Sequence, residues 1–302
     1  MTTAPVLEAT SGRSATGASG LGRVPSTIVR FGRRQPLGAF SAVVLIVLVL
    51  SATLADVVVP YDPIRNNVGP NLEGPDGTHL FGTDHFGRDV FSRIVYGART
   101  SLYVGMGATL LGVLAATLLG AVSGYLGGKL DYFLQRFVDV AQAIPPLIFL
   151  LGVLLVLGPR TEYIILALGL RTGLSLSRIV RGSVIDIKAE DFVEAARSFG
   201  ASDARILARH VLPNIFALII VLVSTTIGGL IVAEAALSFL GFGVPPPTPS
   251  WGGMLSVDGR IYMLAAPWLL IAPAFALTLV VFATNMFGDA LRDELDPRLR
   301  SA

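Results

Sequence analysis

Long apolar segments separated by short polar ones are the dominant pattern of this chain. A helix that crosses a lipid bilayer needs about 20 mostly apolar residues, and the sequence contains six segments of that kind. Hydrophobic residues make up 53% of the chain and charged residues only 15%, against about 25% charged in soluble domains. We therefore predict an all-α membrane protein whose six transmembrane helices lie at about residues 37–60, 101–126, 133–158, 163–180, 212–237 and 263–287.

Two pairs of prolines fall inside the predicted spans. Pro145 and Pro146 lie in the third span, and Pro267 and Pro273 lie in the sixth. Proline lacks the backbone N–H that a helix interior needs, so both spans are expected to be kinked. We expect kinked helices to surround a transport pathway, and Pro145 is a candidate for its wall.

Arg171 is the only charge placed well inside a predicted span. A charge at the bilayer centre costs about 2.5–3.5 kcal/mol on insertion scales, so its side chain should face protein or water. It could meet the carboxylate of a transported peptide, pair with an acid such as Glu234 or Asp139, or extend to the membrane surface. Glu234 is a further candidate for the pathway, with a position at the membrane interface as the alternative.

Small residues recur at a spacing of four in two spans. Gly120 and Gly124 lie in the second span, and Gly169 and Gly173 lie in the fourth. This spacing lets helix backbones approach closely. We expect these glycines to pack helices within the chain, with a contact to a second subunit as the alternative.

The distribution of the 23 lysines and arginines gives the orientation. Cytoplasmic loops carry the excess of these residues. Most lie in the N-terminal tail, the loops that follow the second and fourth spans, and the C-terminal end, so both termini are predicted to be cytoplasmic. The opposite side holds only Arg65, Arg88, Arg93, Arg99, Arg160 and Arg260.

The remaining composition excludes several classes of protein. Cysteine is absent and the three histidines are scattered, which argues against a disulfide framework and against a zinc or haem centre. A net charge of only +2 does not suggest nucleic-acid binding. Residues 1–27 are rich in Ala, Gly, Ser and Thr without apolar periodicity, and they are predicted to form a disordered cytoplasmic tail.

The cytoplasmic loop at residues 189–211 has the pattern of two short helices. Acidic residues at its start suit a helix N-terminus. Apolar residues follow at helical spacing and predict a buried stripe, which consists of Phe192, Val193, Ala196 and Phe199 and continues with Ile206, Leu207 and Val211. Gly200 should end the first helix in a left-handed conformation, and Ser202 should cap the second. The segment could lie on the lipid surface, but its acidic start favours docking to a cytoplasmic partner because anionic lipid would repel it. Pro213 fits the first turn of the next spanning helix.

The spacing of this loop, EAARSFGASDARILARHVLP at residues 194–213, resembles the EAA loop of ABC importer permeases. In that family the loop is the coupling helix, which sits in a cleft of the ATPase subunit. The RHVLPN ending resembles the peptide-importer branch. The resemblance assigns ATPase coupling to Glu194, Ala195, Ala196, Gly200, Leu212 and Pro213.

Three further stretches, at residues 79–102, 234–255 and 288–300, resemble the C-type permease of the dipeptide, oligopeptide and nickel branch. This implies a type I ABC importer permease fold in a bacterial cytoplasmic membrane. It implies a first transmembrane helix at 37–60, an extracytoplasmic segment at 61–98, a permease core at 99–288 and a cytoplasmic C-terminus at 289–302. The implied partners are a second homologous permease, two ABC ATPase subunits and an extracytoplasmic substrate-binding protein. The chain departs from its relatives at residues 171–175.

The chain is not expected to hydrolyse ATP. A phosphate-binding P-loop needs Gly-Lys followed by Ser or Thr. Neither lysine fits, because Leu130 follows Lys129 and Ile187 precedes Lys188. We expect a non-catalytic subunit that binds no cofactor itself, with ATP and Mg²⁺ on the partner ATPases. Import of nickel or another small solute is the alternative, and an ATP-independent channel or secondary transporter is a more distant one.

Overall fold

The structure of the protein is a computed structural model that describes residues 32–295. Five helices in this part are long and apolar enough to cross a membrane, and a bent pair of helices gives a sixth span if it is counted as one. The five are α2 (Pro36–Thr53), α4 (Val90–Leu126), α7 (Thr161–Lys188), α11 (Phe216–Phe239) and α13 (Trp268–Leu295), and the bent pair is α5 (Gly128–Ala143) with α6 (Pro146–Leu157).

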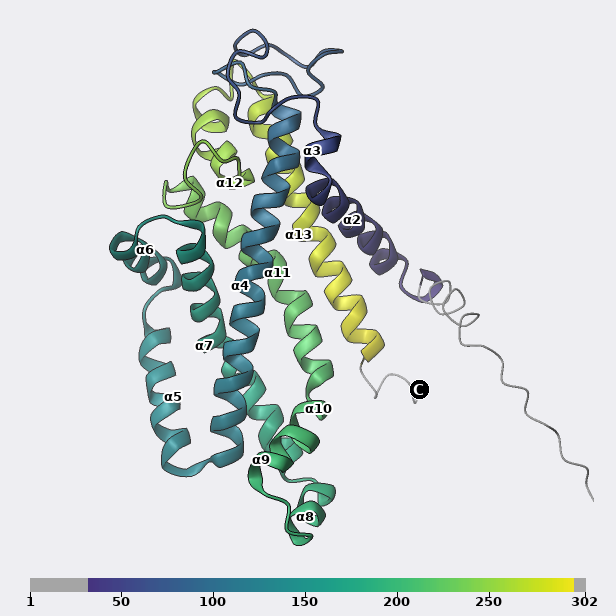
Figure 1. Ribbon diagram of the computed structural model, residues 1–302, viewed down its shortest axis with the longest axis vertical. Coiled ribbons are helices and arrows are strands. Elements are labelled where there is room, and N and C mark those ends of the chain that lie inside the picture. The colour runs from purple at the N-terminus through teal and green to yellow at the C-terminus, as the bar shows by residue number, and fades with distance from the viewer. Residues whose placement is uncertain (1–31, 296–302) are drawn as a thin grey trace, which may run out of the picture.

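These helices form one elongated bundle, with the connecting elements gathered at its two ends (Figure 1). Loops, α3 and α12 lie at one end, and α8 to α10 lie at the other. The predicted all-α architecture is confirmed for the described residues. The predicted tail at residues 1–27 lies outside them.

The short elements are α3 (Ala55–Val58), α8 (Asp191–Ser198), α9 (Asp203–Ile206), the π-helical turn η2 (Leu207–Val211), α10 (Leu212–Asn214), α12 (Trp251–Met254) and the π-helical turn η3 (Leu255–Gly259).

The prolines act as helix boundaries more than as kinks. Between α5 and α6 the chain turns by 90° at Pro145, and Pro146 occupies the first turn of α6. The predicted kink in the third span is confirmed and is a full break. Pro267 lies before the start of α13, so its predicted place inside a helix is wrong. Proline there suits a helix start because no N–H is needed, whereas Pro273 lies within α13.

Several predicted helix ends are also wrong. α2 ends at Thr53 and the short α3 follows. α3 ends before residue 60 because Val59 precedes Pro60 and adopts an extended conformation, as residues before proline do. α4 begins at Val90, well before residue 101, because the Asp89 carboxylate accepts a hydrogen bond from the backbone N–H of Ser92 at 2.8 Å and caps the helix there.

Glycines bring α4 and α7 into close backbone contact. A side chain added at Gly120 would lie 2.6 Å from the carbonyl oxygen of Ser177, and one at Gly124 would lie 2.8 Å from that of Arg181. One at Gly173 would lie 2.9 Å from the carbonyl oxygen of Gly112. The expected packing of these glycines within the chain is therefore confirmed, and α4 and α7 form the central pair of the bundle.

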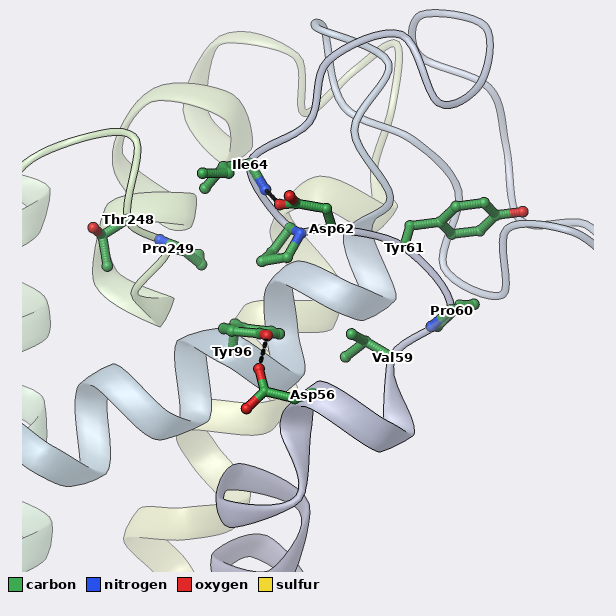
Figure 2. A pocket seen from close by; sticks show the side chains of 10 residues that line it. Asp56, Val59, Pro60, Tyr61, Asp62, Ile64, Tyr96, Thr248 and Pro249 are labelled. Carbon is green, nitrogen blue, oxygen red and sulfur yellow. Dashed lines mark hydrogen bonds between the residues drawn. The ribbon is translucent and has the colours of Figure 1, made fainter.

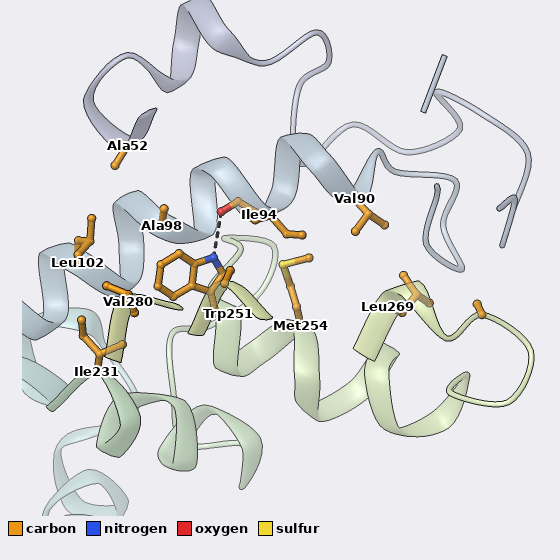
Figure 3. Close-up of a cluster of buried hydrophobic side chains, with 12 residues drawn as sticks. Ala52, Val90, Ile94, Ala98, Leu102, Ile231, Trp251, Met254, Leu269 and Val280 are labelled. Atoms are coloured by element: carbon orange, nitrogen blue, oxygen red, sulfur yellow. Dashed lines mark hydrogen bonds between the residues drawn. The ribbon is translucent and has the colours of Figure 1, made fainter. Parts of the chain in front are cut away.

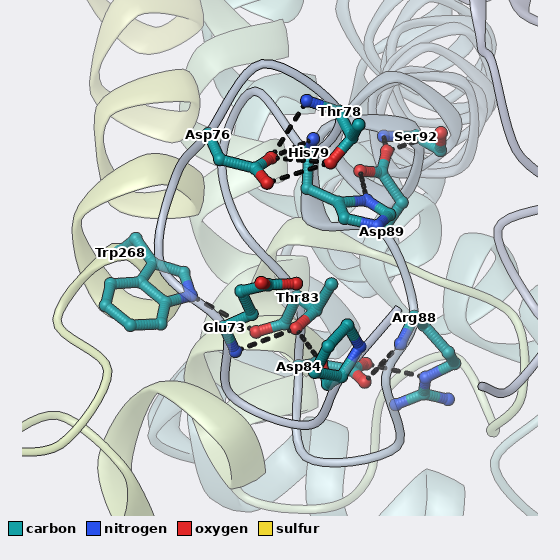
Figure 4. A network of polar contacts seen from close by, with 11 residues as sticks. Glu73, Asp76, Thr78, His79, Thr83, Asp84, Arg88, Asp89, Ser92 and Trp268 are labelled. Atoms are coloured by element: carbon teal, nitrogen blue, oxygen red, sulfur yellow. Dashed lines mark hydrogen bonds and ion pairs between the residues drawn. The ribbon is translucent and has the colours of Figure 1, made fainter. Parts of the chain in front are cut away.

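A polar network holds the loop at residues 59–89 over the end of the bundle that carries α3 and α12, which is called the outer end below because the sequence predicts it to face away from the cytoplasm (Figure 4). The buried Asp84 carboxylate accepts a hydrogen bond from Arg88 Nε at 2.6 Å, and Trp268 of α13 donates to the backbone oxygen of Thr83 at 3.1 Å. Hydrogen bonds from the His79 backbone N–H and from Thr78 hold the pKa of Asp76 below its ordinary value. Arg93 of α4 donates to the backbone oxygen of Pro63 at 3.1 Å, so the loop is fixed to both α4 and α13 by contacts between residues distant in sequence.

Candidate functional site

The loop at residues 189–211 contains the predicted elbow at Gly200. Gly200 has a φ of +78°, and its N–H donates to the carbonyl oxygen of Arg197 at 2.9 Å. The N–H of Ala201 donates to the carbonyl oxygen of Ala196 at 3.1 Å. This pair of hydrogen bonds is the Schellman motif, which ends a helix with a left-handed residue that is usually glycine. Ser202 precedes α9 as predicted, but its side chain makes no capping hydrogen bond.

Apolar side chains attach both arms of the elbow to the bundle. Val193 of α8, Ile206 of α9 and Val211 of η2 are each at most 1% exposed. They share a buried cluster with Val180 and Val184 of α7. Burying side chains of this size stabilises the arrangement by about 1.5–3 kcal/mol each, so the elbow is a fixed part of the structure.

The opposite face of the elbow is open to solvent. Glu194 and Ala195 are exposed, whereas Ala196 is half-buried against the bundle. Phe199 is 91% exposed, although the apolar periodicity had grouped it with the buried Val193. The reason is that Phe199 stands at the end of α8, where the chain turns away into the elbow. The open face of the elbow therefore carries both an acidic and a large aromatic side chain.

Leu212 and Pro213 form the exit from the elbow. Both lie in α10, where Pro213 occupies the first turn. Leu212 packs partly against the same buried cluster as the elbow, and Ile215 then separates α10 from the spanning helix α11. The six predicted coupling residues therefore lie within one continuous structure at the end of the bundle opposite residues 59–89 (Figure 1).

Polar contacts that the sequence did not indicate surround the elbow. The Tyr125 hydroxyl donates to the Asp203 carboxylate at 2.8 Å. Lys188 Nζ donates to the backbone oxygen of Tyr125 at 2.6 Å. Arg181 of α7 makes two hydrogen bonds to Asp131 of α5, at 2.7 and 2.6 Å. Tyr125 and Asp203 are 78 positions apart, so no local pattern could have paired them.

The three predicted pathway residues lie in different environments. Pro145 is exposed at the break between α5 and α6. The Nε atom of Arg171 is buried and has no hydrogen-bond partner among the described residues. Glu234 is fully buried near the outer end of α11, where it accepts hydrogen bonds from the hydroxyls of Ser238 at 2.6 Å and Ser101 at 3.3 Å.

An open hollow of about 540 Å³ lies at the outer end of the bundle (Figure 2). Asp56 of α3 and Tyr96 of α4, which are hydrogen-bonded to each other, form one side of it. Thr248 and Pro249 of the proline-rich loop at residues 245–251 form another. Trp251, at the end of that loop, is fully buried and anchors the loop to the bundle.

Comparison with known proteins places this architecture in a family. Residues 109–301 match the binding-protein-dependent transport system inner membrane component, and residues 29–75 match the N-terminal transmembrane domain of oligopeptide transport permease C. A glutathione transport system permease protein of Escherichia coli O6:K15:H31 is 41% identical over 269 residues, which are 89% of this chain and 88% of the relative. A dipeptide transport system permease protein of Alkalihalophilus pseudofirmus is 38% identical over the same length, with the same coverage.

A solved structure supports the fold independently of sequence. The inward-facing MetNI methionine ABC transporter superposes with a TM-score of 0.55 at 17% identity, over 68% of this chain and 97% of that chain. The predicted type I ABC importer permease fold is thereby confirmed. Given this fold, the family match and the relatives of about 40% identity, the chain belongs to the family of binding-protein-dependent transport system inner membrane components, the multi-pass permease subunits of ABC transporters.

Proposed function

We propose that this chain forms half of the transmembrane pathway of an ATP-driven importer for di- or oligopeptides. The observation that carries the proposal is the elbow at Gly200, which is fixed to the bundle on its apolar side and offers Glu194 and Phe199 on its open side. Such a part transmits force between a bound partner and the helices. The relatives named for dipeptide and glutathione transport support peptides as the substrate class.

The assembly follows from the family. A second homologous permease completes the pathway. Two ABC ATPase subunits bind ATP and Mg²⁺, and they also bind the coupling residues of the two permeases. An extracytoplasmic substrate-binding protein delivers the cargo to the outer end, where the loop at residues 245–251 offers a contact surface or acts as a plug. The chain itself is a non-catalytic subunit of a bacterial cytoplasmic membrane with both termini in the cytoplasm.

Purification of the complex from its host tests this function. We expect ABC ATPase chains to co-purify, and ATP hydrolysis by the reconstituted complex to rise when the substrate-binding protein and a dipeptide are added. Addition of Ni²⁺ in place of the peptide is the control for the small-solute alternative. If Ni²⁺ alone stimulates ATP hydrolysis, the transported substrate is a metal ion and not a peptide. If the substrate is taken up without any ATPase chain, the protein is a channel or a secondary transporter.

We also propose that Arg171 contacts the carboxylate of the transported peptide. Its two expected partners within the chain bind elsewhere, because Asp139 pairs with Arg136 and Arg178, and Glu234 accepts from serine hydroxyls. A buried guanidinium Nε without a partner inside a spanning helix supports a partner that arrives from outside the chain. Pro145, exposed at the break between α5 and α6, is proposed to line the same pathway.

Replacing Arg171 by glutamine should therefore lower uptake of a dipeptide by about tenfold or more, the effect of losing one charge-assisted hydrogen bond. Uptake of the same dipeptide with an amidated C-terminus should change little, because that substrate has no terminal carboxylate. Competition between the two substrates in reconstituted vesicles measures the preference. Arg178→Gln, at an exposed position of the same helix, is the matched control, and an unchanged preference in Arg171→Gln would remove the residue from substrate recognition.

A further inference from the structure

Tyr125 lies where three segments of the chain meet. It belongs to the last turn of α4, is only 3% exposed, and packs in the same buried cluster as Val193 and Ile206 of the elbow. Its hydroxyl donates to Asp203 Oδ1 at 2.8 Å. Asp203 is the first residue of α9, directly beyond the elbow. The second arm of the elbow is therefore joined to α4 by a polar contact as well as by apolar burial.

Lys188 joins the third segment to the same residue. The last carbonyl groups of a helix have no partner within the helix, and the partial negative charge at its C-terminus favours a cation. Lys188, the last residue of α7, donates to the backbone oxygen of Tyr125 at 2.6 Å. It therefore supplies a hydrogen-bond donor to a carbonyl group at the end of α4 and places a positive charge there. Its Nζ also lies 5.3 Å from the centre of the Tyr125 ring, within the range of a cation–π contact.

The two helices behind Tyr125, α4 and α7, are in close backbone contact. Gly124, the preceding residue, brings the backbone of α4 against the carbonyl oxygen of Arg181 in α7, so a shift of one helix relative to the other would produce a clash. The first arm of the elbow, α8, follows α7 after only two residues. The second arm, α9, lies beyond the turn at Gly200. Asp203 in this arm accepts the hydrogen bond from Tyr125 and so joins α9 to α4.

We infer that Tyr125 is a positioning residue that makes the second arm of the elbow move with the α4–α7 pair when the ATPase pulls on the loop. The inference rests on the proposed coupling function and adds a residue that the family motif does not contain. Without the Tyr125–Asp203 hydrogen bond, the ATPase still binds the open face of α8. Part of the movement that the ATPase imposes on the loop is then lost, because α9 moves without moving α4 and α7.

The test compares uptake with ATP hydrolysis in the reconstituted complex. Tyr125→Phe keeps the buried ring and removes only the hydroxyl, which donates to Asp203 and also contacts the side chain of Arg197, and Asp203→Ala removes the acceptor. Each should lower the amount of peptide taken up per ATP hydrolysed by about tenfold, the size expected for one hydrogen bond to a charged group, with unchanged co-purification of the ATPase. The double variant should be no worse than either single one, because both remove the same contact.

Two control variants test whether the Tyr125–Asp203 hydrogen bond itself determines the amount of peptide taken up per ATP hydrolysed. Asp203→Asn keeps an oxygen that accepts the hydrogen bond and should retain the wild-type ratio. Tyr103→Phe, at a position of α4 that is 60% exposed, should also leave the ratio unchanged. A wild-type ratio in Tyr125→Phe, or equal losses of uptake and hydrolysis, would overturn the inference, since a purely structural role lowers both together. Absence of any ATPase from the wild-type complex would instead overturn the proposed function.

Discussion

Replacement of Gly200 by valine is expected to reduce peptide uptake by more than about tenfold while the protein still inserts into the membrane. The φ of +78° at this position is unfavourable for any residue with a Cβ, by about 1–2 kcal/mol, and more so for a β-branched one. Valine would therefore move the backbone out of this conformation. The hydrogen bonds from the N–H groups of Gly200 and Ala201 to α8 would then be lost.

The position also separates a conformational effect from a steric one. A side chain at Gly200 would have no neighbouring atom within 4 Å, so the cost of valine comes from the backbone alone. Asparagine tolerates the left-handed conformation better than other side chains. Gly200→Asn should therefore retain most of the uptake and is the matched control.

The measurement is uptake into vesicles, together with the amounts of permease and ATPase in the purified complex. Normal permease yield with reduced ATPase stimulation is the expected result for Gly200→Val, because the two arms of the elbow would lose their relative orientation. Uptake and stimulation equal to wild type in this variant would show that the shape of the elbow is irrelevant to coupling.

The elbow was predictable because its signals are local. Gly200 determines the turn, and the helical spacing of Val193, Ile206 and Val211 identifies the side that is buried. The bend at Pro145 was predictable for the same reason, since the missing N–H acts on its own helix. The orientation of Phe199 was not, because it depends on where the chain leaves α8 after the last helical turn.

The early start of α4 shows what the sequence could not indicate. The residues that open the helix include Arg93 and Arg99, which resemble a polar loop in sequence. In the structure Arg93 lies 3.6 Å from the buried Asp84 carboxylate, and Arg99 pairs with Asp56 of α3 at 3.3 Å. Both partners come from outside the helix, and the buried Arg93 in particular depends on the loop at residues 59–89, which supplies Asp84. Tyr125 escaped prediction for the same reason, because Asp203 is distant in sequence.

Truncation of Trp251 to alanine is expected to be the most destabilising single change in the outer half of the protein. Trp251 is fully buried in a cluster with side chains of α4, α11 and α13, including Ala98, Ile231 and Val280 (Figure 3). Its Nε1–H donates to the backbone oxygen of Ile94 at 3.0 Å. Deleting a buried aromatic side chain of this size costs about 3–5 kcal/mol, a large part of the about 5–15 kcal/mol that stabilises a typical domain.

The surroundings of the indole leave little room for relaxation. A side chain added at Gly97 would lie 3.1 Å from Trp251 Cδ1, so the ring already lies close to the backbone of α4. Collapse of α4 into the vacated space is opposed by the close contacts that α4 makes with α7 further along its length. The cavity should therefore persist, and the cost should fall near the upper end of the range, because it rises with the volume that remains empty.

Thermal unfolding of the purified complex measures the effect, with Trp251→Phe as the matched control. Phenylalanine keeps most of the buried ring area and loses the hydrogen bond to Ile94, so its loss of stability should be clearly smaller than that of alanine. Because Trp251 ends the loop at residues 245–251 and its indole donates to the backbone of α4, the alanine variant should also loosen this loop, although the backbone N–H of residue 251 can still donate to Ser101 Oγ. A midpoint equal to wild type in Trp251→Ala would mean that the loop is held in place without the indole.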